Sequence, residues 1–300
     1  MDVAVTGSHG FVGSALLPAL ARAGHRVVRL VRGQLAGTDE VGWDPDAGTI
    51  DAAGLEGIDG VVHLAGAGIG DKRWTDARKR LILESRTKGT GLLTRTLAAL
   101  TRRPSVLVSA SAIGYYGDRG DDLLDETSPP GSDFVARVCV QWEAATAPAA
   151  EAGIRVASTR SGLILGRHGG VFPRMLLPFR LGFGGRIASG RQYMSWISID
   201  DEVGAILHAL TQDAVRGPVN VTGPTPVTNA EFTKTLGRVV RRPTVIPTPL
   251  APLKVRYGSE LVQHLLVEGQ RVLPKRLEAT GYQFAHPTLE GALRAALDRH

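Results

Sequence analysis

Residues 2–32 read DVAVTGSHGFVGSALLPALARAGHRVVRLVR, and they decide the fold. A short apolar run over Val3–Val5 meets three glycines in the spacing G-x-x-G-x-x-G. A helical pattern over Phe11–Ala23 follows, and a second apolar run covers Val27–Val31. A strand, a glycine turn, a helix and a second strand predict the βαβ unit of a dinucleotide-binding fold.

The glycine turn predicts a binding site for a pyrophosphate. Glycine lets the backbone turn tightly and approach the phosphates, whose charge is then stabilised by the unpaired N–H groups of the helix. We therefore expect cofactor contacts along this turn, from Gly7, His9, Gly10, Phe11, Val12 and Gly13.

The end of the second strand indicates which dinucleotide binds. An NAD-binding protein usually has an acidic residue there for the ribose 2′-hydroxyl, whereas this chain has Arg32. A guanidinium group suits the additional 2′-phosphate of NADP. The sequence therefore predicts an NADP(H) site with Arg32 on the 2′-phosphate.

Length and composition exclude several classes of protein. The chain has 300 residues, 43% of them hydrophobic, which is enough for a full core, and its one cysteine, Cys139, excludes a disulfide within the chain. It begins directly with a strand, leaving no room for a signal peptide, and has no apolar run of about 18 residues. We expect a cytoplasmic protein with no membrane partner.

The charge pattern argues against a nucleic-acid partner. The net charge is only +6 although the isoelectric point is near 9.8. The arginines are scattered, and no basic run is interleaved with aromatic residues that could stack on bases. An anionic small molecule is the favoured partner. The His, Asp and Glu residues show no metal-ligand spacing, so we expect no metal site.

Strand and helix patterns alternate along most of the chain. This alternation predicts an α/β fold, a Rossmann-type doubly wound parallel sheet with a smaller, mostly helical C-terminal region on the substrate side. We assign residues 1–165 and part of 190–225 to the NADP-binding domain, and residues 166–190 and 226–300 to the smaller domain. Long helices are predicted at Trp74–Leu100 and Phe134–Ala150, and Asp200 or Asp201 is predicted to cap a helix.

Several motifs, taken in order, resemble those of the extended short-chain dehydrogenase/reductases, in particular the sugar-nucleotide-epimerase-like subgroup. The motifs are Thr6-Gly7-x-x-Gly10-x-x-Gly13, His63-Leu64-Ala65-Gly66, Ser109-Ala110-Ser111 with Tyr115-Tyr116-Gly117, and Trp196–Asp201. Further stretches resemble an atypical branch, the SDR39U1-like/YfcH-like proteins, which have their own small C-terminal domain. These stretches are Trp43-Asp44-Pro45, Glu84-Ser85-Arg86, Val138-Cys139 with Trp142-Glu143, and Glu268–Pro274.

The resemblance implies roles for residues outside the glycine turn. His63 and Leu64, with Ala65 and Gly66, would line the adenosine and ribose, and Arg86 would approach the cofactor or a substrate phosphate. Ser111 falls at the position of the catalytic serine. Further cofactor contacts are expected from Ser109 and from Gly162, which would back the nicotinamide. The two long helices correspond to those that pair in dimeric relatives, which implies a homodimer.

The chain departs from this family at the catalytic pair. The usual Tyr-x-x-x-Lys supplies a proton donor and a lysine that lowers the pKa of the tyrosine. The nearest register places Phe134 at the tyrosine position and Val138 at the lysine position. Tyr115 and Tyr116 are the best substitutes, although both also suit packing at a strand end.

Two functions therefore stay open. The first is an NADP(H)-dependent oxidoreductase or epimerase-like enzyme, acting on a small polar or anionic carbonyl or sugar-type substrate through Ser111 with Tyr115 or Tyr116. The second is an NADP(H)-sensing regulatory module with little or no turnover.

Overall fold

The central sheet is built almost entirely from parallel strands. The computed structural model describes residues 1–298, and its largest sheet has eight strands in the order β12-β8-β6-β5-β1-β2-β3-β4. Each neighbouring pair is parallel except β3 and β4. The strands are β1 (Asp2–Thr6), β2 (Arg26–Val31), β3 (Glu40–Asp44), β4 (Thr49–Ile50), β5 (Gly60–His63), β6 (Val106–Ala112), β8 (Arg155–Ser161) and β12 (Gly217–Val221).

The strand order reverses direction at β1, which lies between β2 and β5. In the register, Thr6 lies beside Leu30 of β2 and beside His63 of β5, so the three strands end at nearly the same level. In doubly wound sheets the ligand binds outside the carboxyl ends of the strands at such a point. This edge is where the site must be sought.

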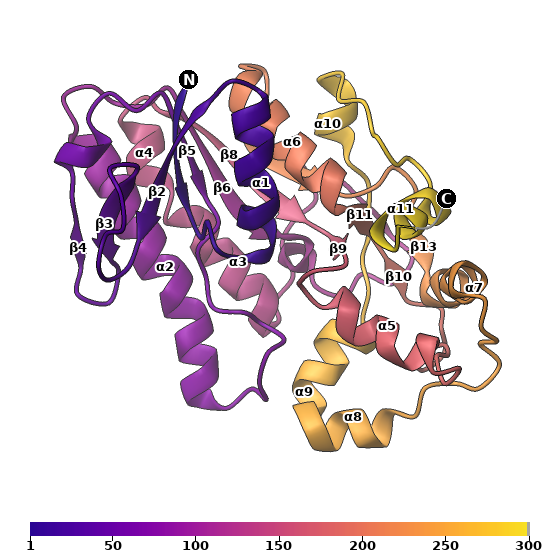
Figure 1. Ribbon diagram of the computed structural model, residues 1–300. Coiled ribbons are helices and arrows are strands. Elements are labelled where there is room, and N and C mark those ends of the chain that lie inside the picture. The colour runs from indigo at the N-terminus through magenta and orange to yellow at the C-terminus, as the bar shows by residue number, and fades with distance from the viewer. Residues whose placement is uncertain (299–300) are drawn as a thin grey trace.

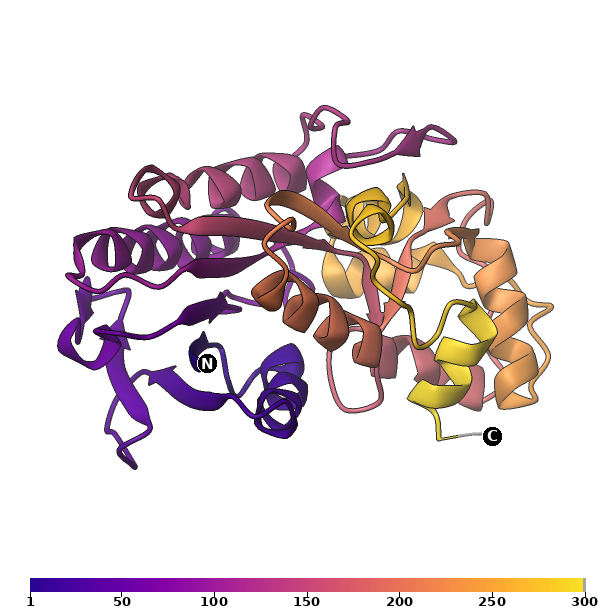
Figure 2. The same ribbon diagram turned by 90° about the horizontal axis from the view of Figure 1, so that it is seen from above.

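Helices cover both faces of the sheet (Figure 2). One face carries α1 (Phe11–Arg22) and α6 (Ile199–Thr211), and the other carries α2 (Asp76–Ala99), α3 (Phe134–Ala144) and α4 (Ala147–Glu151). Successive side chains of β1 point to opposite faces of the sheet, so Val3 and Val5 pack with α1 while Ala4 packs with α2. Apolar residues buried on both faces are typical of a parallel sheet, and the predicted fold class is confirmed.

The C-terminal elements gather at one end of the sheet, to the right in Figure 1. They pack around a third apolar cluster that contains Trp196, Phe172 and Phe232. The elements of this cluster are β9 (Leu163–Leu165), α5 (Phe172–Arg180), β11 (Trp196–Ser198), α7 (Asn229–Val240) and α11 (Leu289–Ala296). The boundaries that separate the two domains in the sequence analysis stay a prediction.

Short elements connect this region to the loops that follow the sheet. A parallel pair joins β7 (Leu123–Leu124) to β14 (Arg271–Val272), and an antiparallel pair joins β10 (Tyr193–Met194) to β13 (Val227–Thr228). Between α7 and β14 lie α8 (Leu250–Tyr257), α9 (Ser259–Val262) and a π-helical turn over Gln263–Val267. The last two helices are α10 (Lys275–Ala279) and α11. Residues distant in sequence are therefore brought to the carboxyl edge of the sheet.

Two predicted helix features differ in the structure. The helix predicted over Phe134–Ala150 is broken into α3 and α4, because Pro148 has no N–H group with which to continue a helix. The predicted capping role of Asp200 or Asp201 is wrong, because Ser198 is the N-cap of α6 and its hydroxyl accepts the N–H of Asp201 at 2.9 Å. The Asp201 carboxylate instead accepts backbone N–H groups of Ala285 and His286, at 2.7 and 3.0 Å.

Over residues 1–298, none of the helices combines the length and the apolar character needed to cross a bilayer.

A buried carboxyl group lies in the first turn of α6. Glu202 is 2% exposed, and one of its oxygens accepts the Ser161 hydroxyl at 2.6 Å, while the other has no hydrogen-bond partner among the described residues. Burial raises the pKa of Glu202 to about 7. The folded protein therefore holds a proton on Glu202 at pH values where the unfolded chain has lost it.

This proton makes stability depend on pH. The stabilisation from protonated Glu202 is fully present below the unfolded pKa of 4.5 and is lost as pH rises through about 7. Between these two pH values the free energy of unfolding should fall by up to about 1.4 kcal/mol per pH unit for this one proton. We expect Glu202→Gln to remove this slope in urea unfolding measured at several pH values. Glu151→Gln, at an exposed position, should retain it. An unchanged slope in Glu202→Gln would contradict the assignment.

Candidate cofactor and active site

The glycine turn between β1 and α1 is shaped by close backbone approaches. Gly7 has a φ of +66°, and a Cβ there would lie 2.9 Å from the carbonyl carbon of Leu64. A Cβ on Gly13 would lie only 2.2 Å from the carbonyl oxygen of Gly7. Side chains are thus excluded at both positions by the turn itself.

The N-terminus of α1 is open to an anion. Its N-cap is Gly10, which provides no side-chain cap, and the first turn has no acidic residue. Gly10 and His9 are exposed, while Phe11 and Val12 are half-buried. The first N–H groups of α1 therefore lack a side-chain acceptor, which is the arrangement that a bound phosphate completes.

Phe11 also has a packing role that the sequence did not indicate. Its ring is enclosed by a glycine-containing loop that follows β9. A Cβ on Gly166 would lie 2.5 Å from the ring, and one on Gly169 would lie 2.6 Å from it. The C-terminal region thus packs directly on the first residue of α1.

Thr6 links the end of β1 to the turn after β5. Its hydroxyl accepts the N–H groups of Leu64 and Ala65 at 3.0 and 3.2 Å and lies 2.8 Å from Nδ1 of His63. With both lone pairs used, the hydroxyl hydrogen goes to Nδ1, so His63 carries its proton on Nε2 and donates it to Thr90 at 2.9 Å.

His63 is therefore a core residue and does not line the cofactor. It is fully buried, both ring nitrogens are bonded, and burial lowers its pKa to about 4. The predicted contact of its ring with adenosine or ribose is wrong. The Ser109 side chain is only 1% exposed, so its hydroxyl is likewise shielded from a ligand at the edge. Leu64, Ala65 and Gly66 follow β5 at partly accessible positions.

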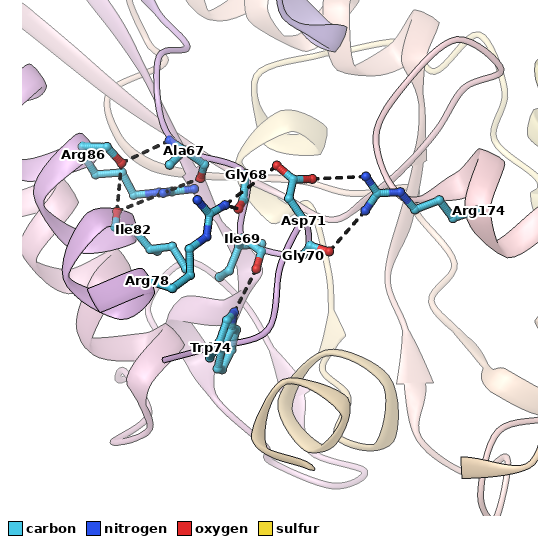
Figure 3. A network of polar contacts seen from close by, with 11 residues as sticks. Ala67, Gly68, Ile69, Gly70, Asp71, Trp74, Arg78, Ile82, Arg86 and Arg174 are labelled. Atoms are coloured by element: carbon cyan, nitrogen blue, oxygen red, sulfur yellow. Dashed lines mark hydrogen bonds and ion pairs between the residues drawn. The ribbon is translucent and has the colours of Figure 1, made fainter. Parts of the chain in front are cut away.

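The loop after β5 is held by three arginines (Figure 3). Arg86 of α2 donates to the carbonyl of Ala67 at 2.9 Å, and Arg78 of the same helix donates to the carbonyl of Gly68. Arg174 of α5 reaches the loop from the opposite side, bonding the carbonyl of Gly70 at 3.2 Å. Both the sheet domain and the C-terminal region thus hold this loop.

Arg86 has no carboxylate partner among the described residues. Its hydrogen bonds go to the carbonyls of Ala67 and Ile82, and its guanidinium lies 4.8 Å from the ring centre of Trp142. Burial lowers the pKa of Arg86, with Arg78 contributing as a second positive charge. A Cβ on Gly66 would lie 3.4 Å from the guanidinium carbon. An uncompensated cation beside this turn favours a bound anion.

Ser111 belongs to a buried polar network. Its hydroxyl donates to Glu143 at 2.6 Å, and Glu143 forms a two-bond ion pair with Arg160, both N···O distances being 2.8 Å. Arg160 also donates to the Tyr116 hydroxyl at 3.0 Å, and that hydroxyl donates to Asn220 at 2.6 Å. One chain of hydrogen bonds thus joins β6, α3, β8 and β12.

The two tyrosines have different environments. Tyr116 is fully buried with its hydroxyl bonded twice, and burial raises its pKa to about 12, so the prediction of Tyr116 as a catalytic group is wrong. Tyr115 is half-buried, and the Arg160 guanidinium carbon lies 3.4 Å from its ring centre. Its hydroxyl has no protein hydrogen bond among the described residues, so of the two tyrosines only Tyr115 has an unbonded hydroxyl.

Helix α3 contains neither tyrosine nor lysine. Phe134 packs edge-on against Trp74 with ring centres 5.2 Å apart, and Val138 is 2% exposed. Both side chains are therefore part of the apolar packing.

Arg32 follows β2 and Gly162 follows β8, and three strands of the sheet lie between β2 and β8. The Arg32 side chain is 70% exposed, and its only ion pair among the described residues is a 4.0 Å contact with Asp46. A shallow hollow of about 390 Å³ adjoins it, lined by Gly33, Trp43 and the β3–β4 hairpin. Gly162 follows β8, and a Cβ there would lie 2.3 Å from the Ser195 carbonyl oxygen.

Comparison with known proteins agrees with this geometry. Residues 3–222 match the family described as the NAD dependent epimerase/dehydratase family. The chain belongs to this epimerase family. Residues 248–296 match a domain of unknown function, DUF1731, which covers the segment from the turn before α8 to the end of α11. The resemblance stated from the sequence motifs is confirmed.

Relatives in the epimerase family match over nearly the whole chain. An epimerase family protein of Mycobacterium bovis is 44% identical over 297 residues, which are 99% of this chain and 98% of that protein. The human epimerase family protein SDR39U1 is 38% identical, over 98% of this chain and 99% of the relative.

Solved structures of the family show the same architecture. The crystal structure of human SDR39U1 with NADPH has a TM-score of 0.92 and 36% identity, covering 100% of both chains. A nucleoside-diphosphate sugar epimerase from Corynebacterium glutamicum has a TM-score of 0.82 and 36% identity, covering 99% of this chain and 58% of that one.

The partners of Ser111 in this epimerase-family chain cannot be recognised from the sequence. Glu143 and Arg160 are separated in sequence, and neither stands out locally, because Glu143 lies near the end of the mostly apolar α3 and Arg160 lies among the polar residues of β8.

Breaking the ion pair between Glu143 and Arg160 should lower the free energy of unfolding much more than breaking an exposed ion pair. Arg160 is 3% exposed, so Glu143→Ala would leave a buried cation without its partner, and we expect a loss of about 3–5 kcal/mol. The exposed pair of Glu84 and Lys88 provides the control, since Glu84→Ala should cost no more than about 0.5 kcal/mol. Denaturant unfolding of both variants measures this, and equal losses would contradict the argument.

Proposed function

We propose that this chain is an NADP(H)-binding, epimerase-like oxidoreductase that acts on a small polar or anionic carbonyl or sugar-type substrate. The observation that carries the proposal is the glycine turn, whose close-packed backbone leads into an α1 N-terminus without a side-chain cap. The human relative crystallised with NADPH supports the choice of cofactor. A cytoplasmic location and a homodimer stay predictions.

The residues present fit the cofactor. The N–H groups at Gly10 and the first turn of α1 would hold the pyrophosphate, and the exposed Arg32 would bind the 2′-phosphate. Leu64, Ala65 and Gly66 would border the ribose, and Gly162 would back the nicotinamide. When bound, the cofactor supplies or accepts a hydride.

The residues around Ser111 would orient the substrate. Because Ser111 donates its hydrogen to Glu143, its oxygen keeps lone pairs that would accept a hydrogen bond from a substrate hydroxyl. Tyr115 would donate or accept the proton at the substrate oxygen, and Arg86 would bind an anionic group of the substrate. Arg160 and Glu143 are positioning residues, which fix Tyr115 and Ser111 respectively.

Cofactor preference tests the first part of the proposal. We expect Arg32→Asp to weaken NADPH binding at least about tenfold, equivalent to about 1.4 kcal/mol, with little change for NADH. Titration calorimetry with both cofactors measures this. Arg22→Asp, at an exposed position in the last turn of α1, should leave both affinities unchanged. Equal losses for NADPH and NADH in Arg32→Asp would remove the 2′-phosphate argument.

Turnover tests the second part. With a panel of carbonyl and sugar-type compounds, we expect Tyr115→Phe to slow NADPH oxidation by about 10²–10⁴-fold, the usual contribution of a proton donor. Ser111→Ala should also slow it, since the substrate hydroxyl loses its acceptor. Tyr116→Phe should mainly lower the free energy of unfolding. Unchanged turnover in Tyr115→Phe and Ser111→Ala would refute the catalytic assignment.

The absence of tyrosine and lysine from α3 favours a second function, an NADP(H)-sensing module with little or no turnover. This function predicts tight, redox-dependent cofactor binding without NADPH consumption by any member of the panel. Turnover of one compound by the wild-type protein would exclude it.

A further inference from the structure

Three side chains that could bind a metal ion converge where α3 meets the C-terminal region. They are Asp133, His264 and Glu268, and one ligand atom from each lies within 4.8 Å of the other two. Asp133 is the N-cap of α3, whereas His264 lies in the π-helical turn and Glu268 directly follows it. The proposed function assigns no role to any of them.

The His264 ring is held in a defined orientation. Its Nδ1 lies 2.6 Å from Glu268, and the ring stacks on Trp74 with centres 6.1 Å apart and planes 19° apart. Trp74 is itself fixed by a hydrogen bond from its indole N–H to the carbonyl of Ile69 at 2.9 Å. The imidazole is therefore oriented before any ligand arrives.

The two carboxylates lack a compensating lysine or arginine. Among the described residues, the only ion pair of Glu268 is with His264, and Asp133 has none. Lys79 lies close, over the Phe134 ring, but its ammonium group is bound to Glu260 at 2.6 Å. The Glu268 and His264 side chains are only 14% and 20% exposed, so water screens this negative charge incompletely.

We propose that Asp133, His264 and Glu268 bind a divalent transition-metal ion of the zinc class. One imidazole nitrogen with two carboxylate oxygens is a donor set that suits such ions, and three protein ligands leave a fourth position for water or a substrate group. Zinc bonds of about 2.0–2.2 Å place tetrahedral ligand atoms roughly 3.4 Å apart. Small side-chain rotations would therefore bring the three ligand atoms, which lie within 4.8 Å of one another, to the distances that zinc requires. The ion would join α3 to the C-terminal region without requiring NADP(H).

The test uses the full chain, stripped of metal with a chelator and titrated with ZnCl₂. We expect one high-affinity zinc ion per chain and a rise in Tm on binding. Asp133→Asn, His264→Gln and Glu268→Gln should each weaken zinc binding at least about tenfold. Asparagine is also a good N-cap, so Asp133→Asn keeps the cap of α3, and circular dichroism verifies that each variant is folded.

The matched control is the pair formed by His286 and Asp200, whose side chains are 3.0 Å apart. This pair is not part of the three-residue group, so His286→Gln should leave zinc binding unchanged. The proposal is overturned if the wild-type protein binds no zinc at micromolar concentrations, or if the three ligand variants bind it as tightly as the wild type does.

Discussion

The hydroxyl of Thr6 takes part in three hydrogen bonds that hold the carboxyl ends of β1 and β5 together, at the point where the strand order reverses. Two come from backbone N–H groups that the parallel ladder leaves unpaired, and the third orders the buried ring of His63. Through His63 the same network reaches Thr90 of α2. The short side chain of Thr6 thus helps to set the distance between the glycine turn and the turn after β5.

The glycine turn needs this spacing because its backbone packs against that of the β5 turn. A Cβ at Gly7 would collide with the backbone of Leu64, so the glycine turn and the turn after β5 can pack this closely only because residue 7 is a glycine. The loop that continues from β5 is then held by arginines of α2 and α5 (Figure 3). Hydrogen bonds to the backbone carbonyls of this loop therefore connect the carboxyl edge of the sheet to the C-terminal region.

Polar groups near the edge fall into two kinds. His63, Tyr116 and the Glu143–Arg160 pair are buried and fully bonded, and they stabilise the fold and fix its geometry. Among residues 1–298, Arg32 has only a 4.0 Å ion pair, Arg86 has no carboxylate partner and the Tyr115 hydroxyl has no hydrogen bond, so these groups are the ones proposed to bind a ligand. This distinction separates Tyr115 from Tyr116. Ser111 is buried and bonded to Glu143 like the first kind, and it enters the proposed site only through the lone pairs of its oxygen.

The sequence alone determined the parallel α/β fold, the glycine turn and the absence of a Tyr-x-x-x-Lys pair, because each depends on local spacing and on the hydrophobic pattern. Local spacing could not separate Tyr115 from Tyr116, since adjacent side chains differ only in which one the tertiary structure buries. It also could not show that Asp133 meets His264 and Glu268, which lie far along the chain. Burial and long-range contacts decide whether a polar residue is bonded within the protein or left for a ligand, and only the tertiary structure contains them.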